Sequence, residues 1–132
     1  MLIILTLMAM SLQSSDEETS FRAAQDFARC WALYDSLADR LEASGMAANA
    51  TEMRDTGRGA MLAAEFFSYE AGISPNLRDE FLQQTYESER SRQRAFSERQ
   101  ENDVDLMDRC LELNPIQVEV VQLLRMEAYS QE

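Results

Sequence analysis

An apolar stripe with helical spacing, which runs from Phe21 to Leu41, constrains the fold of this chain more than any other feature. Its members recur every three or four residues, as the buried face of an amphipathic helix requires. They are Phe21, Ala24, Phe27, Ala28, Trp31, Tyr34, Leu37, Ala38 and Leu41. Ser15 and Glu18 form a capping-box pattern before the stripe, and Gly45, a residue suited to the left-handed end of a helix, follows it. We therefore predict one long helix between these two signals.

The rest of the chain carries further helix signals and no alternation typical of a β-strand. A second helix is predicted over residues 49–72, and a third begins at Ser74-Pro75, where serine caps the helix and proline takes its first position. A shorter helix is expected over residues 103–113, and Asn114-Pro115 is typical of the start of a last one. Because the connections are only a few residues long, neighbouring helices should be antiparallel. The predicted fold is an all-α, up-down bundle of four to five helices.

The N-terminal segment is short and apolar. Residues 1–12 hold only two polar side chains, Thr6 and Ser11, before an acidic stretch begins. The segment is too short to span a bilayer, but it matches the apolar region of a secretory signal, with Ala9 and Ser11 as the small residues of a cleavage site before Leu12. No Lys or Arg precedes it, although such signals usually begin with one. We expect residues 1–11 to be the signal peptide of an exported protein, periplasmic or secreted, with a short retained N-terminal anchor as the alternative, and residues 12–132 to form a single helical domain.

The charged side chains exclude several kinds of chemistry. The chain has 24 acidic residues against 12 basic ones, all of them arginine, and a net charge of −12; lysine and histidine are absent. Without lysine there is no Schiff-base or P-loop chemistry, and without histidine there is no imidazole base, metal ligand or pH switch. An acidic surface repels nucleic acid and favours a basic protein partner. We therefore expect no enzyme activity, no catalytic residue, no cofactor, no metal site and no nucleic-acid partner.

Cys30 and Cys110 are the only cysteines of the chain. Two cysteines without histidine supply too few ligands for a typical zinc site, and a catalytic thiolate would lack its histidine base. An oxidising compartment, which the N-terminal segment indicates, favours a disulfide. If successive helices alternate in direction, the helix of Cys110 descends beside the first helix, near Cys30. We predict a Cys30–Cys110 disulfide; two buried free thiols are the alternative.

A basic cluster lies within residues 87–101. It consists of Arg90, Arg92, Arg94 and Arg99, and no residue from 87 to 94 is apolar. One interpretation is an exposed arm that binds an acidic or phosphorylated partner. The other is a solvated helix held by Glu87–Arg90 and Arg94–Glu98 pairs, and we favour it because four acids of the segment nearly cancel its charge. The four arginines are therefore named only as an interaction cluster to be tested.

Other motifs of the chain are assigned to packing. Trp31 and Tyr34 could line a ligand pocket, but an aromatic stripe at helical spacing more often belongs to the core. Gly57 and Gly59 lie in the sequence DTGRGAML, which lacks the preceding strand of a phosphate-binding loop, so we expect close helix packing or a local break there. The apolar face of the last helix is expected to be buried. Its members are Ile116, Val120, Val121 and Leu124.

These observations favour a binding protein over an enzyme. The leading hypothesis is a small exported acidic helical protein that acts by protein–protein binding, for example as an inhibitor or immunity-type factor for a basic enzyme. The alternative is an accessory or structural subunit of a membrane-associated assembly, which would contact the membrane only through a retained N-terminal segment. An enzyme that uses carboxylates or tyrosine alone is the least favoured class.

Overall fold

The computed structural model describes the backbone of residues 2–130 and the side chains of residues 16–128. This part of the chain forms four α-helices, α1 (Leu2–Ala43), α2 (Ala47–Glu70), α3 (Pro75–Glu98) and α4 (Val104–Ser130), and it contains no strand. The predicted all-α bundle is confirmed. The predicted helix start at Ser15 is wrong, because α1 continues upstream through residues that include neither glycine nor proline. The predictions for residues 1–11 fall outside the described side chains.

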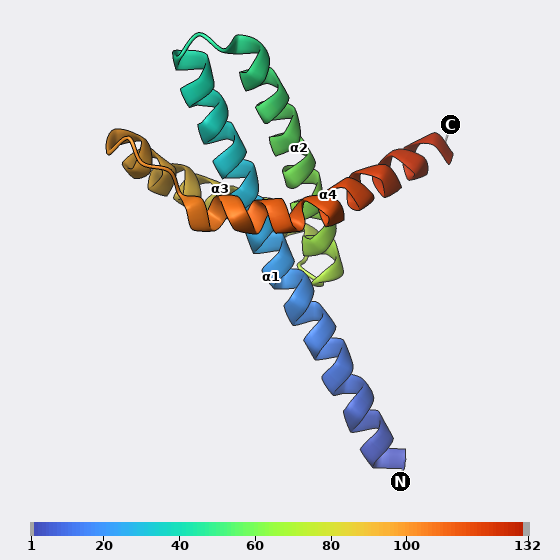
Figure 1. Ribbon diagram of the computed structural model, residues 1–132. Coiled ribbons are helices and arrows are strands. Elements are labelled where there is room, and N and C mark those ends of the chain that lie inside the picture. Colours follow the sequence, from blue (N-terminus) through green and yellow to red (C-terminus); the bar gives the residue numbers. More distant parts are fainter. Residues whose placement is uncertain (1, 131–132) are drawn as a thin grey trace.

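α1 and α2 form an antiparallel pair, against which the other two helices pack. In Figure 1 this pair runs side by side, and α4 crosses both of its helices. α3 also packs against α1 and α2. The C-terminal half of α4 extends to one side, away from the other helices (Figure 1). That half of α4 is therefore held less closely by the rest of the fold.

Two glycines end the first two helices where the sequence predicts. Gly45 follows α1 with a φ of +81°, and Gly72 follows α2 with a φ of +76°. In both turns, the N–H of the next residue donates to a carbonyl of the last helical turn, at 2.9 and 3.2 Å. These backbone conformations are rare for other residues, so both helix ends are set locally. α3 then begins at Pro75 directly after Ser74, as predicted, although the Ser74 side chain makes no capping hydrogen bond.

The helix start predicted at Asn114-Pro115 is wrong. α4 continues through Pro115, so the helix predicted over residues 103–113 and the last predicted helix are two halves of one element. Pro115 lies on the exposed face of α4, where water can reach the carbonyl that loses its hydrogen bond. The buried face, which includes Leu113 and Gln117, passes this point without interruption. Tertiary packing therefore overrides the local signal.

The core lies where the four helices meet. Buried apolar residues come from every helix: Phe27, Cys30, Leu33, Ala60, Ala63, Ala64, Leu82, Leu106, Cys110, Leu113 and Val120 are among them. The ring of Phe27 stacks on that of Phe67 in α2, with 5.6 Å between centroids. Trp31 is half-buried beside this cluster, and its ring stacks on Tyr86 of α3 at 3.8 Å. Trp31 thus belongs to the α1–α3 interface.

The two glycines of α2 allow two other helices to approach it closely. A Cβ at Gly57 would lie 3.3 Å from the Cβ of Tyr34 in α1. A Cβ at Gly59 would lie 2.7 Å from Nε2 of Gln117 in α4. That Nε2 donates a hydrogen bond to the carbonyl of Thr56 at 2.9 Å. Because α2 is continuous here, the glycines serve close packing and do not mark a break.

Cys30 of α1 and Cys110 of α4 form the predicted disulfide. Their sulfurs are 2.11 Å apart, their Cα atoms are 5.7 Å apart, and both side chains are buried. An ion pair joins the same two helices nearby, where Arg109 donates to Asp26 at 2.9 Å. The N-terminal half of α4 is thereby fixed on α1, and this sets the direction in which the C-terminal half leaves the bundle.

Candidate protein-binding surface

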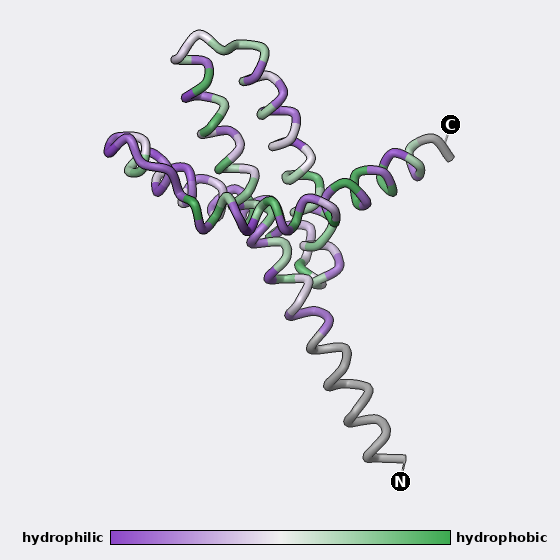
Figure 2. Tube along the Cα trace, in the orientation of Figure 1, coloured by the Kyte–Doolittle hydropathy of each residue, from purple (hydrophilic) through white to green (hydrophobic). Residues whose placement is uncertain are grey.

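The C-terminal half of α4 exposes apolar side chains. Hydrophobic residues continue along the helix past the point where it crosses α2 (Figure 2). Ile116, Leu123 and Met126 are 42%, 51% and 69% exposed, whereas Val120, on the side toward the bundle, is buried. The predicted burial of Val120 is therefore confirmed, and that of Ile116 is wrong.

Ile116, Leu123 and Met126 share one side of α4, and we call them the α4 stripe. Leu123 follows Ile116 by seven residues and Met126 follows Leu123 by three, spacings that place side chains on one helix face. Glu119 lies one turn from both Ile116 and Leu123, and Glu112 lies one turn before Ile116. Along this face of α4 the apolar side chains therefore alternate with carboxylates.

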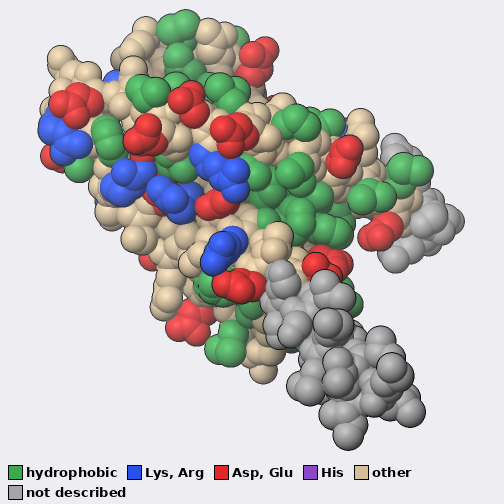
Figure 3. Space-filling view, turned by 60° about the horizontal axis from the view of Figure 1, so that its bottom comes forward, with side chains coloured by type: hydrophobic (Ala, Val, Ile, Leu, Met, Phe, Trp, Pro, Cys, Tyr) green, Lys and Arg blue, Asp and Glu red, His purple; other side chains and the backbone are tan. Residues whose placement is uncertain are grey.

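At Ile116 the α4 stripe adjoins a groove between α1, α2 and α4. The groove has a volume of about 320 Å³. Its apolar walls are formed by Ala23, Phe27, Phe67, Leu113 and Ile116. Figure 3 shows hydrophobic side chains gathered into a patch on the face that it draws, among separate acidic and basic ones. A groove of this size and lining can accept a large apolar side chain of another molecule.

Two arginines at the edge of the groove are already paired. Arg22 donates to Glu18 at 3.0 Å, and Arg109 donates to Asp26 at 2.9 Å and to Glu112 at 3.3 Å. The hydrogen bond to Asp26 is the main reason why the pKa of Arg109 is raised above its usual value. With the edge charges paired, the apolar walls determine what the groove can bind.

The four arginines named from the sequence do not form one surface. Arg90 crosses to α1 and donates to Asp39 at 2.7 Å, whereas Arg92 turns toward the start of α4. Arg99 pairs with a glutamate two residues later at 3.1 Å. Arg94 makes no hydrogen bond or ion pair with any described residue. Neither ion pair predicted within residues 87–98 forms between described side chains: Arg90 finds its acceptor on another helix, and Arg94 and Glu98 do not pair.

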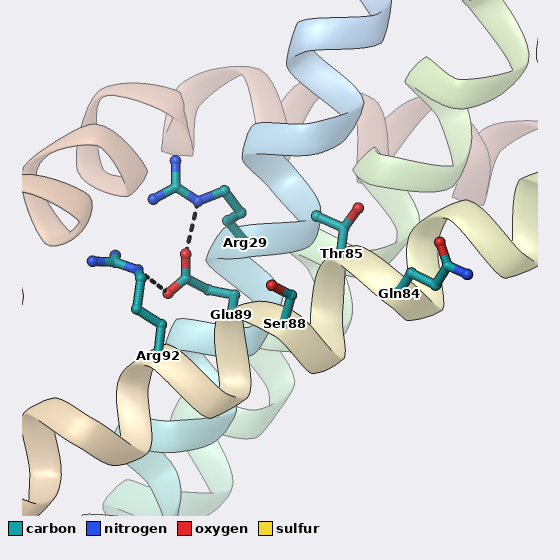
Figure 4. A pocket seen from close by; sticks show the side chains of 6 residues that line it. All are labelled: Arg29, Gln84, Thr85, Ser88, Glu89 and Arg92. Carbon is teal, nitrogen blue, oxygen red and sulfur yellow. Dashed lines mark hydrogen bonds and ion pairs between the residues drawn. The ribbon is translucent and has the colours of Figure 1, made fainter.

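A buried network of charged residues was not anticipated from the sequence. Glu89, which is only 4% exposed, accepts hydrogen bonds from Nε of Arg29 at 2.7 Å and from Nε of Arg92 at 2.8 Å (Figure 4). Asp103, which is 7% exposed, accepts from Arg92 and from Gln93, the latter at 3.0 Å. The network joins α1, α3 and the start of α4.

The hollow beside this network has a volume of about 290 Å³ and is lined partly by Thr85 and Ser88 (Figure 4). Burial alone would lower the pKa of Arg92, but its hydrogen bonds and the charges of Glu89 and Asp103 outweigh that effect and raise it. Because arginines occupy both carboxylates, the network links helices and presents no free acid or base. One feature of the sequence could have indicated the network: Glu89 follows Leu82 by seven residues, so both side chains lie on the buried face of α3.

A second polar contact joins α1 to α3 next to Trp31. The hydroxyl of Tyr86 donates to Oδ2 of Asp35 at 2.6 Å. Burial and then this hydrogen bond raise the pKa of Tyr86 to about 12. The phenol is therefore held neutral and acts as a structural donor at neutral pH.

In the described part of the chain no helix is long and apolar enough to cross a membrane, and no group of three or more His, Cys, Asp or Glu residues could hold a metal ion. No protein-family model, no curated protein and no solved structure matches the chain. The class of protein must therefore be inferred from the fold and the surface of this chain alone. The described residues form an all-α bundle with a disulfide between α1 and α4 and an exposed apolar stripe on α4.

Proposed function

We propose that this chain acts by binding another protein through the α4 stripe and the adjoining groove, without catalysis of its own. The observation that carries the proposal is the exposure of Ile116, Leu123 and Met126 along one face of α4, whose C-terminal half extends from the bundle. Exposed large apolar side chains that share one helix face and adjoin an apolar groove are typical of an interaction site. A groove at one end of the stripe adds the kind of concave site in which an apolar anchor residue of a partner is buried.

Charge supports a basic partner. The net charge is −12, and Glu112 and Glu119 lie beside the α4 stripe. A partner that presents an apolar side chain flanked by Lys or Arg would bury the first in the groove and pair a basic group with Glu119, because Glu112 already accepts from Arg109. Opposite charge would also raise the rate of encounter. An inhibitor or immunity-type factor that covers a basic enzyme has these properties.

Two observations support export. Disulfides form and persist in oxidising compartments, and Cys30–Cys110 is such a bond. The apolar segment before Leu12 is the expected signal. The mass of the mature chain distinguishes the two hypotheses: a chain that begins near Leu12 supports an exported binding protein. A chain that retains Met1 supports a subunit of a membrane-associated assembly.

Affinity capture with two matched variants tests the proposal. Leu123→Glu and Val118→Glu each place a carboxylate at an exposed position of α4, 51% and 45% exposed, but only Leu123 belongs to the stripe. The full chain and both variants are incubated with extract of the cells that encode it, after circular dichroism has shown equal helicity. We expect a protein that binds the unchanged chain and Val118→Glu but not Leu123→Glu. If Leu123→Glu retains every bound protein, the stripe is not the contact surface.

A further inference from the structure

Three arginines surround a groove between α1 and α3, apart from the α4 stripe. The groove has a volume of about 190 Å³. Arg40 of α1 and both Arg90 and Arg94 of α3 line it, together with the hydroxyl-bearing Ser36 and Ser97. Two helices therefore bring guanidinium groups to one hollow of an acidic protein.

Two of the three arginines, Arg40 and Arg94, have N–H groups that donate to no described residue. Arg94 makes no hydrogen bond or ion pair with any described residue, although Glu98 lies one turn away. Arg40 uses only Nη1, for two acceptors in the segment before α4 at 3.1 and 3.2 Å. Arg90 is held in place, because its terminal nitrogens donate to Ser36 at 2.9 Å and to Asp39 at 2.7 Å. Arg40 and Arg94 can thus donate to a ligand without breaking an ion pair.

The groove carries an excess of positive charge. Asp39 is the one carboxylate among its described lining residues, and Arg54 shares this carboxylate with Arg90, at 3.2 and 2.7 Å. Burial alone would raise the pKa of Asp39, but the hydrogen bonds and charges of Arg90 and Arg54 outweigh it and lower the pKa. Three arginines therefore face one ionised and already paired carboxylate. An unpaired arginine is unusual in this chain: besides Arg94, only Arg125 lacks a hydrogen bond or ion pair among the described residues.

We propose that this groove binds a phosphate group, held by the guanidinium groups of Arg40 and Arg94. Each guanidinium presents paired N–H donors whose geometry matches two oxygens of a phosphate. A phosphate with nearly two negative charges attracts both arginines at once, whereas a single carboxylate offers one charge for the pair. The hydroxyl of Ser97 can add a donor at the edge. The phosphate is either the free anion or a monoester on a larger molecule, and the site does not depend on the proposed α4 contact.

The test follows the arginine side chains of the full-length protein by nitrogen-15 NMR. Inorganic phosphate is titrated at constant ionic strength while the Nε–Hε signals are recorded. Arg94→Gln removes a proposed ligand-binding group, and Arg125→Gln removes the other unpaired arginine, on α4, as the matched control. We expect saturable shifts at Arg40 and Arg94, an apparent Kd that rises about tenfold or more in Arg94→Gln, and no change in Arg125→Gln.

Phosphoserine serves as a second probe that distinguishes the two sources of phosphate. A Kd for phosphoserine clearly below that for inorganic phosphate supports a bound monoester, and equal values support the free anion. Shifts that rise in proportion to concentration without saturating, or equal Kd values for Arg94→Gln and the unchanged chain, would overturn the proposal. Because Arg94 is exposed and unpaired, its replacement should leave the circular dichroism spectrum unchanged.

Discussion

Cys30 and Cys110 join the middle of α1 to the first half of α4, and neither side chain is more than 1% exposed. The bond is therefore protected from solvent by the core that it helps to hold. The α4 stripe begins beyond this point, at Ile116, and continues to Met126 in the C-terminal half of α4. The disulfide thus helps to fix the α4 stripe beside the groove between α1, α2 and α4, although neither cysteine belongs to the stripe or lines that groove.

Cys30→Ser and Cys110→Ser should destabilise the protein equally, because either change removes the same bond. In the chain-entropy model a loop of this length contributes up to about 4.5 kcal/mol. Urea unfolding of the two variants and of the double variant measures the loss, and the three values should agree within about 1 kcal/mol. Single variants that differ by more than this, or that lose no stability, would show that the bond has another role.

Reduction of the Cys30–Cys110 disulfide should destabilise α4 before the other helices. Without the disulfide, α4 is held by the burial of Leu106, Leu113 and Val120 and by polar contacts such as the hydrogen bond of Gln117 to Thr56. Hydrogen exchange of the reduced protein should therefore become faster in α4 first. Uniform acceleration in all four helices would argue against this order.

Glu89→Gln should lower the free energy of unfolding by about 1–3 kcal/mol. The change removes the carboxylate that accepts from both Arg29 and Arg92, and the partial exposure of these arginines keeps the loss below that of a fully buried pair. Glu98→Gln is the matched control on the same helix, since Glu98 is exposed, and it should change stability by less than about 0.5 kcal/mol. If both changes lower the free energy of unfolding equally, the effect comes from the loss of one negative charge and not from the hydrogen bonds of the network.

Stability should fall at high pH through Tyr86. Its pKa is raised from 10.0 to about 12 in the folded protein, so the unfolded chain loses this proton first. The contribution is fully present below pH 10 and is lost as the pH rises toward 12. Denaturant unfolding between these values should show a steeper decline for the unchanged chain than for Tyr86→Phe. Parallel declines would show that Tyr86 is not the group responsible.

Association with the proposed basic partner should slow as ionic strength rises. Glu119→Gln removes a carboxylate beside the α4 stripe, and Glu52→Gln removes an exposed one on α2. Stopped-flow association rates across a salt series should show a weaker salt dependence for Glu119→Gln than for Glu52→Gln. If the two variants are alike, the attraction comes from the acidic surface as a whole and not from the stripe.

Features of the fold that depend on neighbouring residues could be predicted. Gly45 and Gly72 end helices because their backbone conformations are local properties, and Ser74 with Pro75 begins one for the same reason. Pro115 was misleading because the cost of a proline depends on which face of the helix it occupies. Packing decides which face of α4 is exposed, and the residues around Pro115 do not show which face that will be.

The candidate surfaces depend on tertiary structure and were harder to predict. Ile116 has the spacing of a buried residue, yet it is exposed at the edge of the groove, whereas Gln117 and Val120 on the neighbouring side of α4 are buried. Arg90 could reach partners within its own helix, but Asp39 of α1 lies closer to its guanidinium in the folded chain. The Cys30–Cys110 pairing could be predicted because these are the only two cysteines, although α4 crosses α1 and does not run antiparallel beside it as expected.

Site-specific photo-crosslinking in intact cells tests the central claim most directly. A photoreactive residue replaces Leu123, in the α4 stripe, and in a second sample it replaces Val118, an exposed residue on a different side of the same helix. If the stripe is the contact surface, the residue at position 123 gives a discrete heavier adduct with one protein and the residue at position 118 does not. The same adducts from both positions, or none from position 123, would contradict the proposed function.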